Sequence, residues 1–343
     1  MKRRRKKKLV SVTNNSDLPE AIIEQILSCL PVKALLRFKS VSKDWNSIIL
    51  DHHFIFLHSE NSSLLIYNKS ENDEFVVLDG CKGLLLEQSI VNNNNNSRLY
   101  RIRNPEIGQL VQLPNPQNNP SLLMTLDFLP SKQVFKILSI YKDENSRNLG
   151  CEILTIGNES SCLWRLLELP TCQNVENVTN CHVFVTSEVS YCIWGIINQT
   201  AAIKIDILDM ENEIYITTAT LPRGNFTSKL GFDNYIEWNE KVSFGKIVND
   251  ELHVLVLDDY KTNKWIEEKR TVKMKNLKEE DEPIEILSVN DLELYFLLPE
   301  KKSFYRYNFT SGKVDIVLSD YDDSKVLAVF HSSLYTLNGM HSI

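Results

Sequence analysis

The chain has 343 residues, 43% of them apolar, and a formal net charge of −7 at pH 7. That length suits one large domain or two ordinary ones. Seven of the 38 basic residues lie in the opening run from Lys2 to Lys8, so 31 remain in the rest of the chain, against 45 acidic residues. Nucleic-acid phosphates attract a basic surface, which this acidic body does not offer. We therefore expect no nucleic acid among the partners.

The sequence shows no pattern typical of a membrane span, a secretory signal or a metal site. No stretch approaches 18 consecutive apolar residues, so we expect no membrane-spanning helix, and no apolar run follows the basic start as it does in a signal peptide. The chain has seven cysteines and no CxxC, and five cysteines from Cys151 to Cys192 recur every 9 to 11 residues. This spacing is typical of strands rather than of metal ligands. We expect reduced thiols, no metal and no cofactor.

The basic run from Lys2 to Lys8 has two interpretations. It is a solvated tail, predicted here over residues 1–15, or a nuclear-import signal. With no other sorting signal in the sequence, we expect the protein in the nucleus and the cytoplasm.

Residues 17–50 predict three short helices. Asp17 followed by Glu20 fits a capping box, and apolar residues then recur at helical spacing as far as Pro31. That proline ends the first helix and can open the second. Ser42 is a suitable N-cap for the third helix.

After about residue 60 the pattern changes to that of an all-β domain, with about 22 short apolar runs separated by turn residues. Five strand–turn–strand segments recur at steps of about 55, 49, 52 and 48 residues. Their second strands begin near Gln109, Trp164, Glu213, Trp265 and Lys313. This period is typical of four-stranded propeller blades.

The last predicted strands, KVLAVFHSS and LYTL, follow the fifth repeat without an outer hairpin of their own. Strands just after residue 60 can complete their blade, which would close the ring and remove exposed sheet edges. The expected fold is α+β and multidomain. A small three-helix domain over residues 16–58 precedes an all-β, propeller-like domain of about six blades over residues 60–343.

The helical segment carries more apolar residues than about 40 residues can bury by themselves. An uncovered apolar surface of that size marks a protein-binding site. The segment LPEAIIEQILSCLPVKALLRFKSVSKDWNSIILDHHFIFLH closely resembles the F-box. The matching features are Leu18-Pro19, Ile26-Leu27, Leu30-Pro31-Val32-Lys33, Leu35-Leu36-Arg37-Phe38, Val41-Ser42-Lys43 and Trp45. A helical cap packed on the β domain is the alternative interpretation.

The remainder resembles the F-box-associated domain of a large set of F-box proteins that are abundant in plants. GCKGLLLE (80–87) is similar to that family's G-x-x-N-G-L-L segment, with Lys82 where Asn is usual. RIRNPEIGQLVQLP is similar to its W-N-P-x-T-G-x-x-x-x-L-P segment, with Arg103 in place of Trp and Ile107 in place of Thr. NKWIEEKRTV and FYRYNFTSGKVDIV resemble its last two hairpins.

This resemblance implies the substrate-recognition subunit of an SCF-type (Skp–cullin–F-box) ubiquitin ligase, a receptor and not an enzyme. The helices would dock on a Skp-family adaptor and through it on a cullin. The β domain would hold the protein substrate, and whether that substrate is glycosylated is left open. The family's adaptor contacts carry over to Leu18, Pro19, Ile22, Ile26, Leu27, Leu30, Pro31, Leu35, Leu36, Val41 and Trp45. Some of these residues must instead pack the helices together.

Two other functions stay open. A propeller enzyme such as a glycan hydrolase needs convergent acid and base groups at the central funnel, and the sequence shows no recurrent carboxylate at the inner edge of a blade. An F-box scaffold acting outside a ligase is the other.

No catalytic residue is assigned, and the substrate-binding residues cannot be assigned from the sequence. Among the tryptophans, Trp164 and Trp265 are expected in blade cores, because they share a repeat position. Trp238, in the polar stretch DNYIEWNEK, is the candidate for an exposed recognition residue.

Overall fold

The structure is a computed structural model. It describes residues 18–61, 64–68, 74–89, 98–118, 121–142, 149–157, 163–168, 178–185, 189–196, 202–222, 235–238, 241–248, 250–273, 284–289, 292–319, 327–337 and 340–342. The predicted basic tail and the predicted capping role of Asp17 lie outside these residues.

The amino-terminal domain is helical, with one helix more than predicted. The helices are α1 (Glu20–Ser28), α2 (Val32–Phe38), α3 (Lys43–Leu50) and α4 (His52–Asn61). Pro19 and Pro31 occupy the N-cap positions of α1 and α2, and neither offers a side-chain cap. Ser42 caps α3 as predicted, since its hydroxyl accepts a hydrogen bond from the backbone N–H of Trp45 at 3.0 Å. The expectation of three helices is therefore wrong: α4 continues the domain.

The β domain is built of antiparallel sheets whose strands follow one another in chain order. Four sheets have four strands each. They are β6 (Ser121–Leu129), β7 (Val134–Lys142), β8 (Leu149–Ile156) and β9 (Arg165–Leu167); β10 (Val178–Val185), β11 (Ser190–Ile196), β12 (Ala202–Asp209) and β13 (Ile214–Thr220); β14 (Tyr235–Trp238), β15 (Lys241–Val248), β16 (Glu251–Asp259) and β17 (Lys264–Thr271); and β18 (Glu285–Val289), β19 (Glu293–Leu298), β20 (Ser303–Asn308) and β21 (Val314–Ser319).

Two further sheets differ in size. One has five strands, β2 (Phe75–Cys81), β3 (Leu84–Ser89), β4 (Tyr100–Asn104), β5 (Gln109–Leu113) and β23 (His341–Ser342). The other has two, β1 (Leu64–Asn68) and β22 (Leu327–His331). Short meandering sheets of this kind are the blades of a β-propeller.

The predicted repeat corresponds to the fourth strand of each of five sheets. The second strands of the five predicted hairpins are β5, β9, β13, β17 and β21, and each begins at or within one residue of its expected position. The described residues form four blades of four strands, so the expectation of about six blades is not confirmed.

The two ends of the β domain pair with each other, as predicted. Leu64 in β1 lies opposite His331 in β22, and the register continues to Asn68 opposite Leu327. The expectation that LYTL forms a strand is wrong, because residues 334–337 have no strand structure. Instead β23, at the very end of the described chain, extends the five-stranded sheet by pairing with β5.

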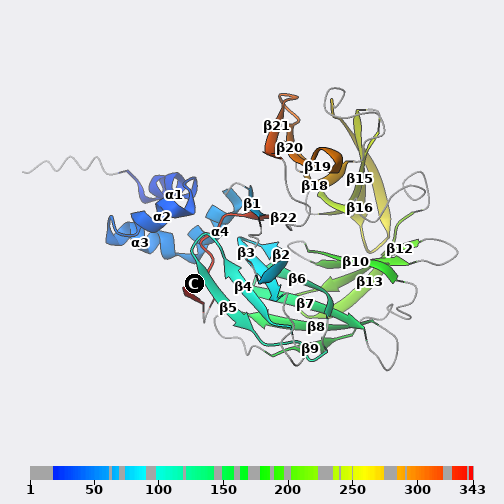
Figure 1. Cartoon of the computed structure of the whole chain (residues 1–343), viewed down its shortest axis with the longest axis horizontal. Coiled ribbons are helices and arrows are strands. Elements are labelled where there is room, and N and C mark those ends of the chain that lie inside the picture. The colour runs from blue at the N-terminus through cyan, green and yellow to red at the C-terminus, as the bar shows by residue number, and fades with distance from the viewer. Residues whose placement is uncertain are drawn as a thin grey trace, which may run out of the picture.

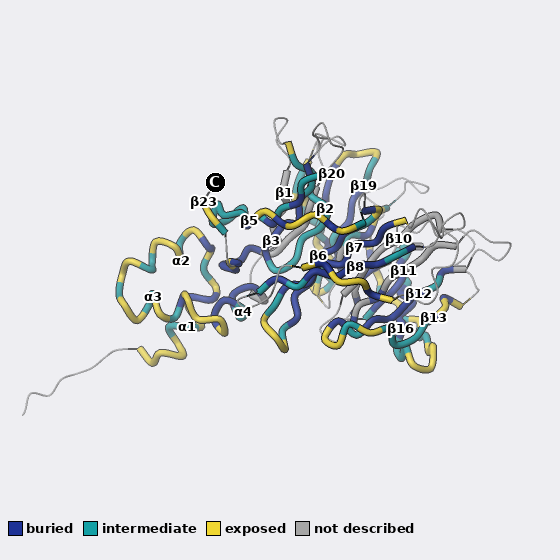
Figure 2. The backbone as a smooth tube through the Cα atoms, turned by 90° about the horizontal axis from the view of Figure 1, so that it is seen from below, coloured by how far each residue is buried: buried dark blue, intermediate teal, exposed yellow. Residues whose placement is uncertain are grey.

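The helices lie at one end of the molecule, and α1, α2 and α3 project away from the sheets (Figure 1). The tube view shows the exposed residues of these three helices and the deeper burial of α4 and the sheets (Figure 2). Apolar residues of the helices share one core with β3, β4, β6 and β7. The helical domain is therefore packed onto the β domain rather than tethered to it by a free linker.

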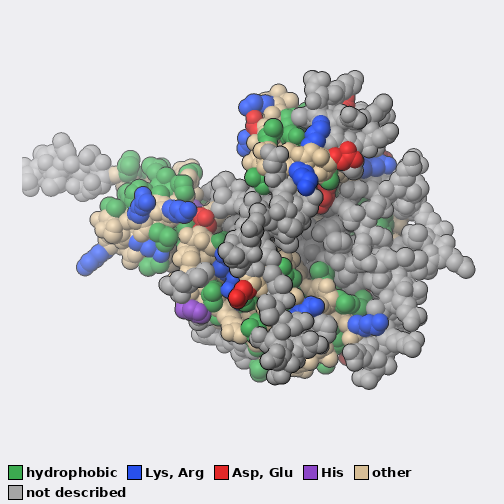
Figure 3. Space-filling view, in the orientation of Figure 1, with side chains coloured by type: hydrophobic (Ala, Val, Ile, Leu, Met, Phe, Trp, Pro, Cys, Tyr) green, Lys and Arg blue, Asp and Glu red, His purple; other side chains and the backbone are tan. Residues whose placement is uncertain are grey.

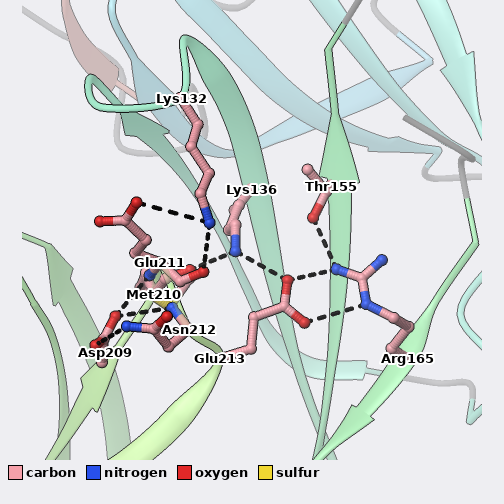
Figure 4. Close-up of polar contacts among 9 residues, drawn as sticks. All are labelled: Lys132, Lys136, Thr155, Arg165, Asp209, Met210, Glu211, Asn212 and Glu213. Atoms are coloured by element: carbon pink, nitrogen blue, oxygen red, sulfur yellow. Dashed lines mark hydrogen bonds and ion pairs between the residues drawn. The ribbon is translucent and has the colours of Figure 1, made fainter. Parts of the chain in front are cut away.

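A polar network joins two neighbouring blades (Figure 4). Glu213, in the turn between β12 and β13, forms ion pairs with Lys136 at 2.9 Å and with Arg165 at 2.5 Å. The Lys136 side chain is only 3% exposed, and its ammonium group also donates to the carbonyl of Met210. Burial works to raise the pKa of Glu213, but hydrogen bonds from Arg165 and Lys136 outweigh it and hold this pKa below its usual value.

Candidate functional site

Exposed apolar side chains run along helix α1 and the residue pair before it. We call Leu18, Ile22 and Ile26 the α1 stripe. Leu18, Ile22 and Ile26 are 57%, 41% and 51% exposed. They are spaced four residues apart, so they lie on one face of the helix and its entry. Ile22 and Ile26 on this nine-residue helix, with Leu18 just before it, form an apolar surface with no covering element in the chain as described. This stripe is the part of the molecule that best fits a protein partner.

The structure divides the eleven predicted contact residues into three groups. Seven are exposed, namely Leu18, Pro19, Ile22, Ile26, Pro31, Leu36 and Val41, and Leu30 and Trp45 are half-buried. Leu27 and Leu35 are buried in the core that the helices share with the β domain. These two leucines hold the helices together, so they are not available to a partner while the domain is folded.

Charged residues accompany the apolar surface, and the sequence analysis did not assign them. Lys33, Arg37 and Lys43 are exposed on α2 and α3. Lys33 and Arg37 are four residues apart, with exposed Leu36 between them on the same side of α2. Figure 3 shows hydrophobic side chains gathered over α1 and basic side chains over α2 and α3. Leu50, at the end of α3, is a further exposed apolar residue (53%) outside the predicted set.

Helix α4 supports this surface from behind. Phe54 and Ile55 are buried in the shared core. The Nε2 atom of His58 lies 2.9 Å from the carbonyl oxygen of Leu30, at the end of the α1 segment. Burial lowers the pKa of His58, more than the hydrogen bond to Leu30 raises it. The neutral ring then donates its Nε2–H to Leu30, which fixes α4 against α1.

The tryptophans of the β domain do not form an exposed surface in the part of the chain described. The expectation that Trp238 is exposed is wrong: it is 2% exposed, its Nε1–H donates to Glu268 at 2.9 Å, and Arg270 lies 4.6 Å from its ring centre. Trp164 is buried and donates to the carbonyl of Pro114 at 2.9 Å. Half-buried Trp265 packs against the core of its blade, 6.0 Å from Phe244 between ring centres.

Two carboxyl groups lie on neighbouring strands of different sheets, Asp79 on β2 and Asp127 on β6. Burial raises the pKa of both, to about 7 for Asp127. The carboxylate of Asp79 accepts hydrogen bonds from the backbone N–H of Leu126 at 2.8 Å, from that of Gly80 at 2.7 Å and from the hydroxyl of Thr125. These bonds tie β2 to β6, so Asp79 has a structural role in joining two blades.

Metal sites and membrane spans were also considered. The described ranges contain no group of three or more His, Cys, Asp or Glu side chains placed to hold a metal ion. Within the same ranges, every helix is too short or too polar to cross a membrane.

Comparison with known families and curated proteins identifies the helical segment. Residues 15–57 match the F-box domain family. An F-box protein of Arabidopsis thaliana is 24% identical over 230 residues, which cover 57% of this chain and 62% of that protein. An F-box/kelch-repeat protein of the same plant is 44% identical over 54 residues, which cover 16% of this chain and 14% of that protein. The chain therefore spans less than two thirds of the length of these relatives.

Solved structures resemble the β domain only distantly. The β-propeller domain of the Trilobed protease from Pyrococcus furiosus aligns with a TM-score of 0.42 and 10% identity, over 72% of this chain and 85% of that one. An exo-β-1,3-galactanase from Phanerochaete chrysosporium aligns with a TM-score of 0.39 and 8% identity, over 78% of this chain and 70% of that one.

Proposed function

From the F-box domain that the chain carries at residues 15–57, we propose that the protein is the substrate-recognition subunit of an SCF-type ubiquitin ligase. Its helices bind a Skp-family adaptor, and the adaptor links it to a cullin. The β domain, from about residue 60 onward, binds the protein to be ubiquitinated. Such a receptor works by raising the concentration of its substrate beside the ubiquitin-carrying enzyme.

The observation that carries this proposal is the exposed apolar stripe on α1. Leu18, Ile22 and Ile26 are each more than 40% exposed, and they belong to the segment that matches the F-box family. Burying an exposed leucine or isoleucine side chain against a partner contributes about 1.5–3 kcal/mol. Three of them, with Leu36 and Val41 beside them, supply an anchor of the kind found at the centre of protein interfaces.

The test is co-purification with a co-expressed Skp-family adaptor. The double substitution Leu18→Ala with Pro19→Ala removes two exposed contacts without touching the shared core. We expect an affinity loss of about 30-fold, corresponding to about 2 kcal/mol, with unchanged melting of the β domain. Leu122→Ala is the matched control, because Leu122 is 59% exposed on β6 of the β domain.

The outcomes separate the competing functions. Retained adaptor binding in the double variant contradicts the role of Leu18 and Pro19. Failure of the unaltered protein to bind any adaptor overturns the proposal as a whole. A scaffold working outside a ligase binds the adaptor but supports no ubiquitin transfer in a reconstituted assay.

We propose that the protein is not itself an enzyme. Asp79 on β2 and Asp127 on β6 are the nearest candidates for an acid and a base, and the oxygens of Asp79 are engaged by Gly80, Thr125 and Leu126. This engagement supports a structural role for Asp79 and leaves Asp127 as the group to test. Substrate-dependent turnover that is lost in Asp127→Asn, with the fold retained, would overturn this part of the proposal and favour a propeller enzyme.

The β domain is proposed to be an F-box-associated domain of about six blades. In this assignment the five-stranded sheet is the first blade, and the β1–β22 pair is a reduced sixth blade that the two ends of the domain share. The identity of the substrate, including whether it carries glycans, is left to affinity purification after proteasome inhibition.

Nuclear and cytoplasmic localisation is proposed from the basic run Lys2–Lys8. Replacing these seven residues with Ser or Gln should shift a fluorescent fusion toward the cytoplasm. An unchanged distribution would identify the run as a solubilising tail.

A further inference from the structure

The segment of residues 332–337 is buried although it forms no strand or helix. Ser333, Leu334, Tyr335 and Leu337 are at most 6% exposed. Irregular segments usually run over the surface, because their backbone groups need hydrogen-bonding partners that a core does not offer. The partners of this segment therefore show what holds it in place. We call residues 332–337 the clasp segment.

Asn104, at the end of β4, supplies two of these partners. Its side-chain amide donates to the carbonyl oxygens of Ser333 and Tyr335, both at 3.0 Å. Its carbonyl oxygen accepts from the backbone N–H of Glu106 at 3.0 Å, within the β4–β5 turn. Asn104 is fully buried, so the amide satisfies the clasp backbone in a place that water does not reach. The clasp segment is thus fastened to the five-stranded sheet.

A second fastening reaches the β2–β3 turn. The hydroxyl of Ser333 donates to the backbone carbonyl of Lys82 at 2.5 Å. The ammonium group of Lys82 lies 5.3 Å from the ring centre of Phe56 on α4, within the range of a cation–π contact. The turn that receives the clasp segment therefore also touches the helical domain.

Aromatic rings continue the connection to α4. The ring centre of Tyr335 lies 5.0 Å from that of Phe128 and 5.5 Å from that of Phe135. Phe128 in turn lies 6.5 Å from Phe56. These separations are those of favourable ring pairs. Tyr335 thus packs behind the ring on which α4 rests, and residues of the helices, the sheets and the clasp segment belong to one core.

Helix α4 connects these aromatic residues to the helices that carry the α1 stripe. His58 of α4 is hydrogen-bonded to Leu30, and Phe54 of α4 shares its core with Leu27 and Leu35. The path from the clasp segment to the α1 stripe is therefore Tyr335, Phe128, Phe56 and then α4 itself.

We propose that the clasp segment fixes the orientation of the helical domain on the β domain. Because orientation determines where a bound substrate lies relative to a docked adaptor, this segment is a positioning element; that consequence rests on the proposed function. Removing the Tyr335 ring leaves a cavity behind Phe128, and Phe56 then has no rigid surface to pack on. The helical domain should sample more orientations while its own contact surface stays intact.

The test measures the distance between the two domains directly in the full chain. Spin labels on bioorthogonal amino acids replace Lys33 on α2 and Lys269 on β17, both exposed. Pulsed electron paramagnetic resonance then gives the distribution of distances between the labels. Tyr335→Ala should broaden it about twofold, while Thr336→Ala, at the exposed neighbouring position in the clasp segment, should leave it unchanged. Phe56→Ala provides a second variant on the α4 side should Tyr335→Ala fail to fold.

Adaptor affinity of Tyr335→Ala should stay within about twofold of the unaltered protein, since the α1 stripe is untouched. A distribution as narrow as that of the unaltered protein in a folded Tyr335→Ala, or in Phe56→Ala should Tyr335→Ala fail to fold, overturns the proposal. Failure of the unaltered protein to bind an adaptor would overturn the proposed function but leave the distance measurement valid. The two failures are thus distinguishable.

Discussion

Asp127 illustrates at the residue scale how burial changes a side chain's chemistry. Burial is the main cause that raises the pKa of Asp127 from 3.8 to about 7, and the nearby carboxylate of Asp79 raises it further. A hydrogen bond with the backbone of Phe128 lowers this pKa, as do the positive charges of Lys136 and Lys82. Between about pH 4 and pH 7 the folded protein therefore holds a proton that the unfolded chain has released. Raising the pH across this window destabilises the fold.

Asp127→Asn should remove this pH dependence. The amide keeps an oxygen for the Phe128 hydrogen bond but does not titrate. From pH 5 to pH 7 the unfolding free energy of the variant should rise relative to that of the unaltered protein, by up to about 1.4 kcal/mol per pH unit. Urea unfolding at several pH values measures this. Asp315→Asn is the control, because hydrogen bonds from Lys313 and Arg306 lower the pKa of Asp315. Parallel pH profiles for Asp127→Asn and the unaltered protein would contradict the raised pKa.

Trp238 shows at the same scale what the sequence does not reveal. Its neighbours in DNYIEWNEK are polar, which favours exposure. The partners that bury it, Glu268 and Arg270, lie on β17 about 30 residues later. A polar stretch can thus hold a core residue when distant polar side chains cover it. By contrast, Ser42 was predictable as a cap, because capping depends only on residues within one turn.

At the element scale, the five hairpins were predictable because their turns are local. The β2–β3 turn, outside those five, shows the same local dependence: it places Lys82 and Gly83 at positive φ angles of 47° and 79°, the geometry that favours Asn-Gly. This explains why Asn is usual at the position of Lys82 in the family that the segment resembles. Helix α4 was missed because Phe54, Ile55 and Phe56 are consecutive. A helix packed between two partners is apolar on several faces, so it lacks the one-sided period of an amphipathic helix.

The β12–β13 turn gives a prediction at this scale. Glu213→Gln removes the charge that balances the buried ammonium of Lys136, so it should cost at least about 1.5 kcal/mol of unfolding free energy. Glu211→Gln is the matched control in the same turn, because Glu211 and its partner Lys132 are 45% and 49% exposed with a 3.7 Å separation. Exposed pairs of this kind contribute about 0–1 kcal/mol. Equal denaturation midpoints for the two variants would show that the network does not join the blades.

At the scale of the whole molecule, the pairing of the chain ends was predictable from the strands left without a hairpin, and β1 and β22 do pair. The packing of the helical domain on the β domain could not be predicted from the sequence. It depends on Phe56, Phe128 and Tyr335, which are far apart in the chain. Strand β23 could not be predicted either, because a strand of two residues is too short to give a periodic signal.

Deleting residues 325–343 should unfold the β domain cooperatively. The deletion removes β22, the clasp segment and β23 together, so β1 loses its partner and Asn104 keeps a buried amide without acceptors. Each buried polar group left unsatisfied costs about 1–3 kcal/mol, which is a large part of the stability of an ordinary domain. Thermal unfolding followed by circular dichroism measures the effect. A truncated protein that melts like the full chain would contradict closure of the β domain by its two ends.

The most direct measurement of the proposed function is hydrogen–deuterium exchange of the full chain with and without a Skp-family adaptor. The exposed stripe of Leu18, Ile22 and Ile26 predicts that α1 becomes protected on adding the adaptor, together with the exposed side of α2, while the strands from β2 to β21 exchange as before. Protection confined to the β domain, or no protection anywhere at saturating adaptor, would contradict the assignment of the helices as the adaptor-binding surface.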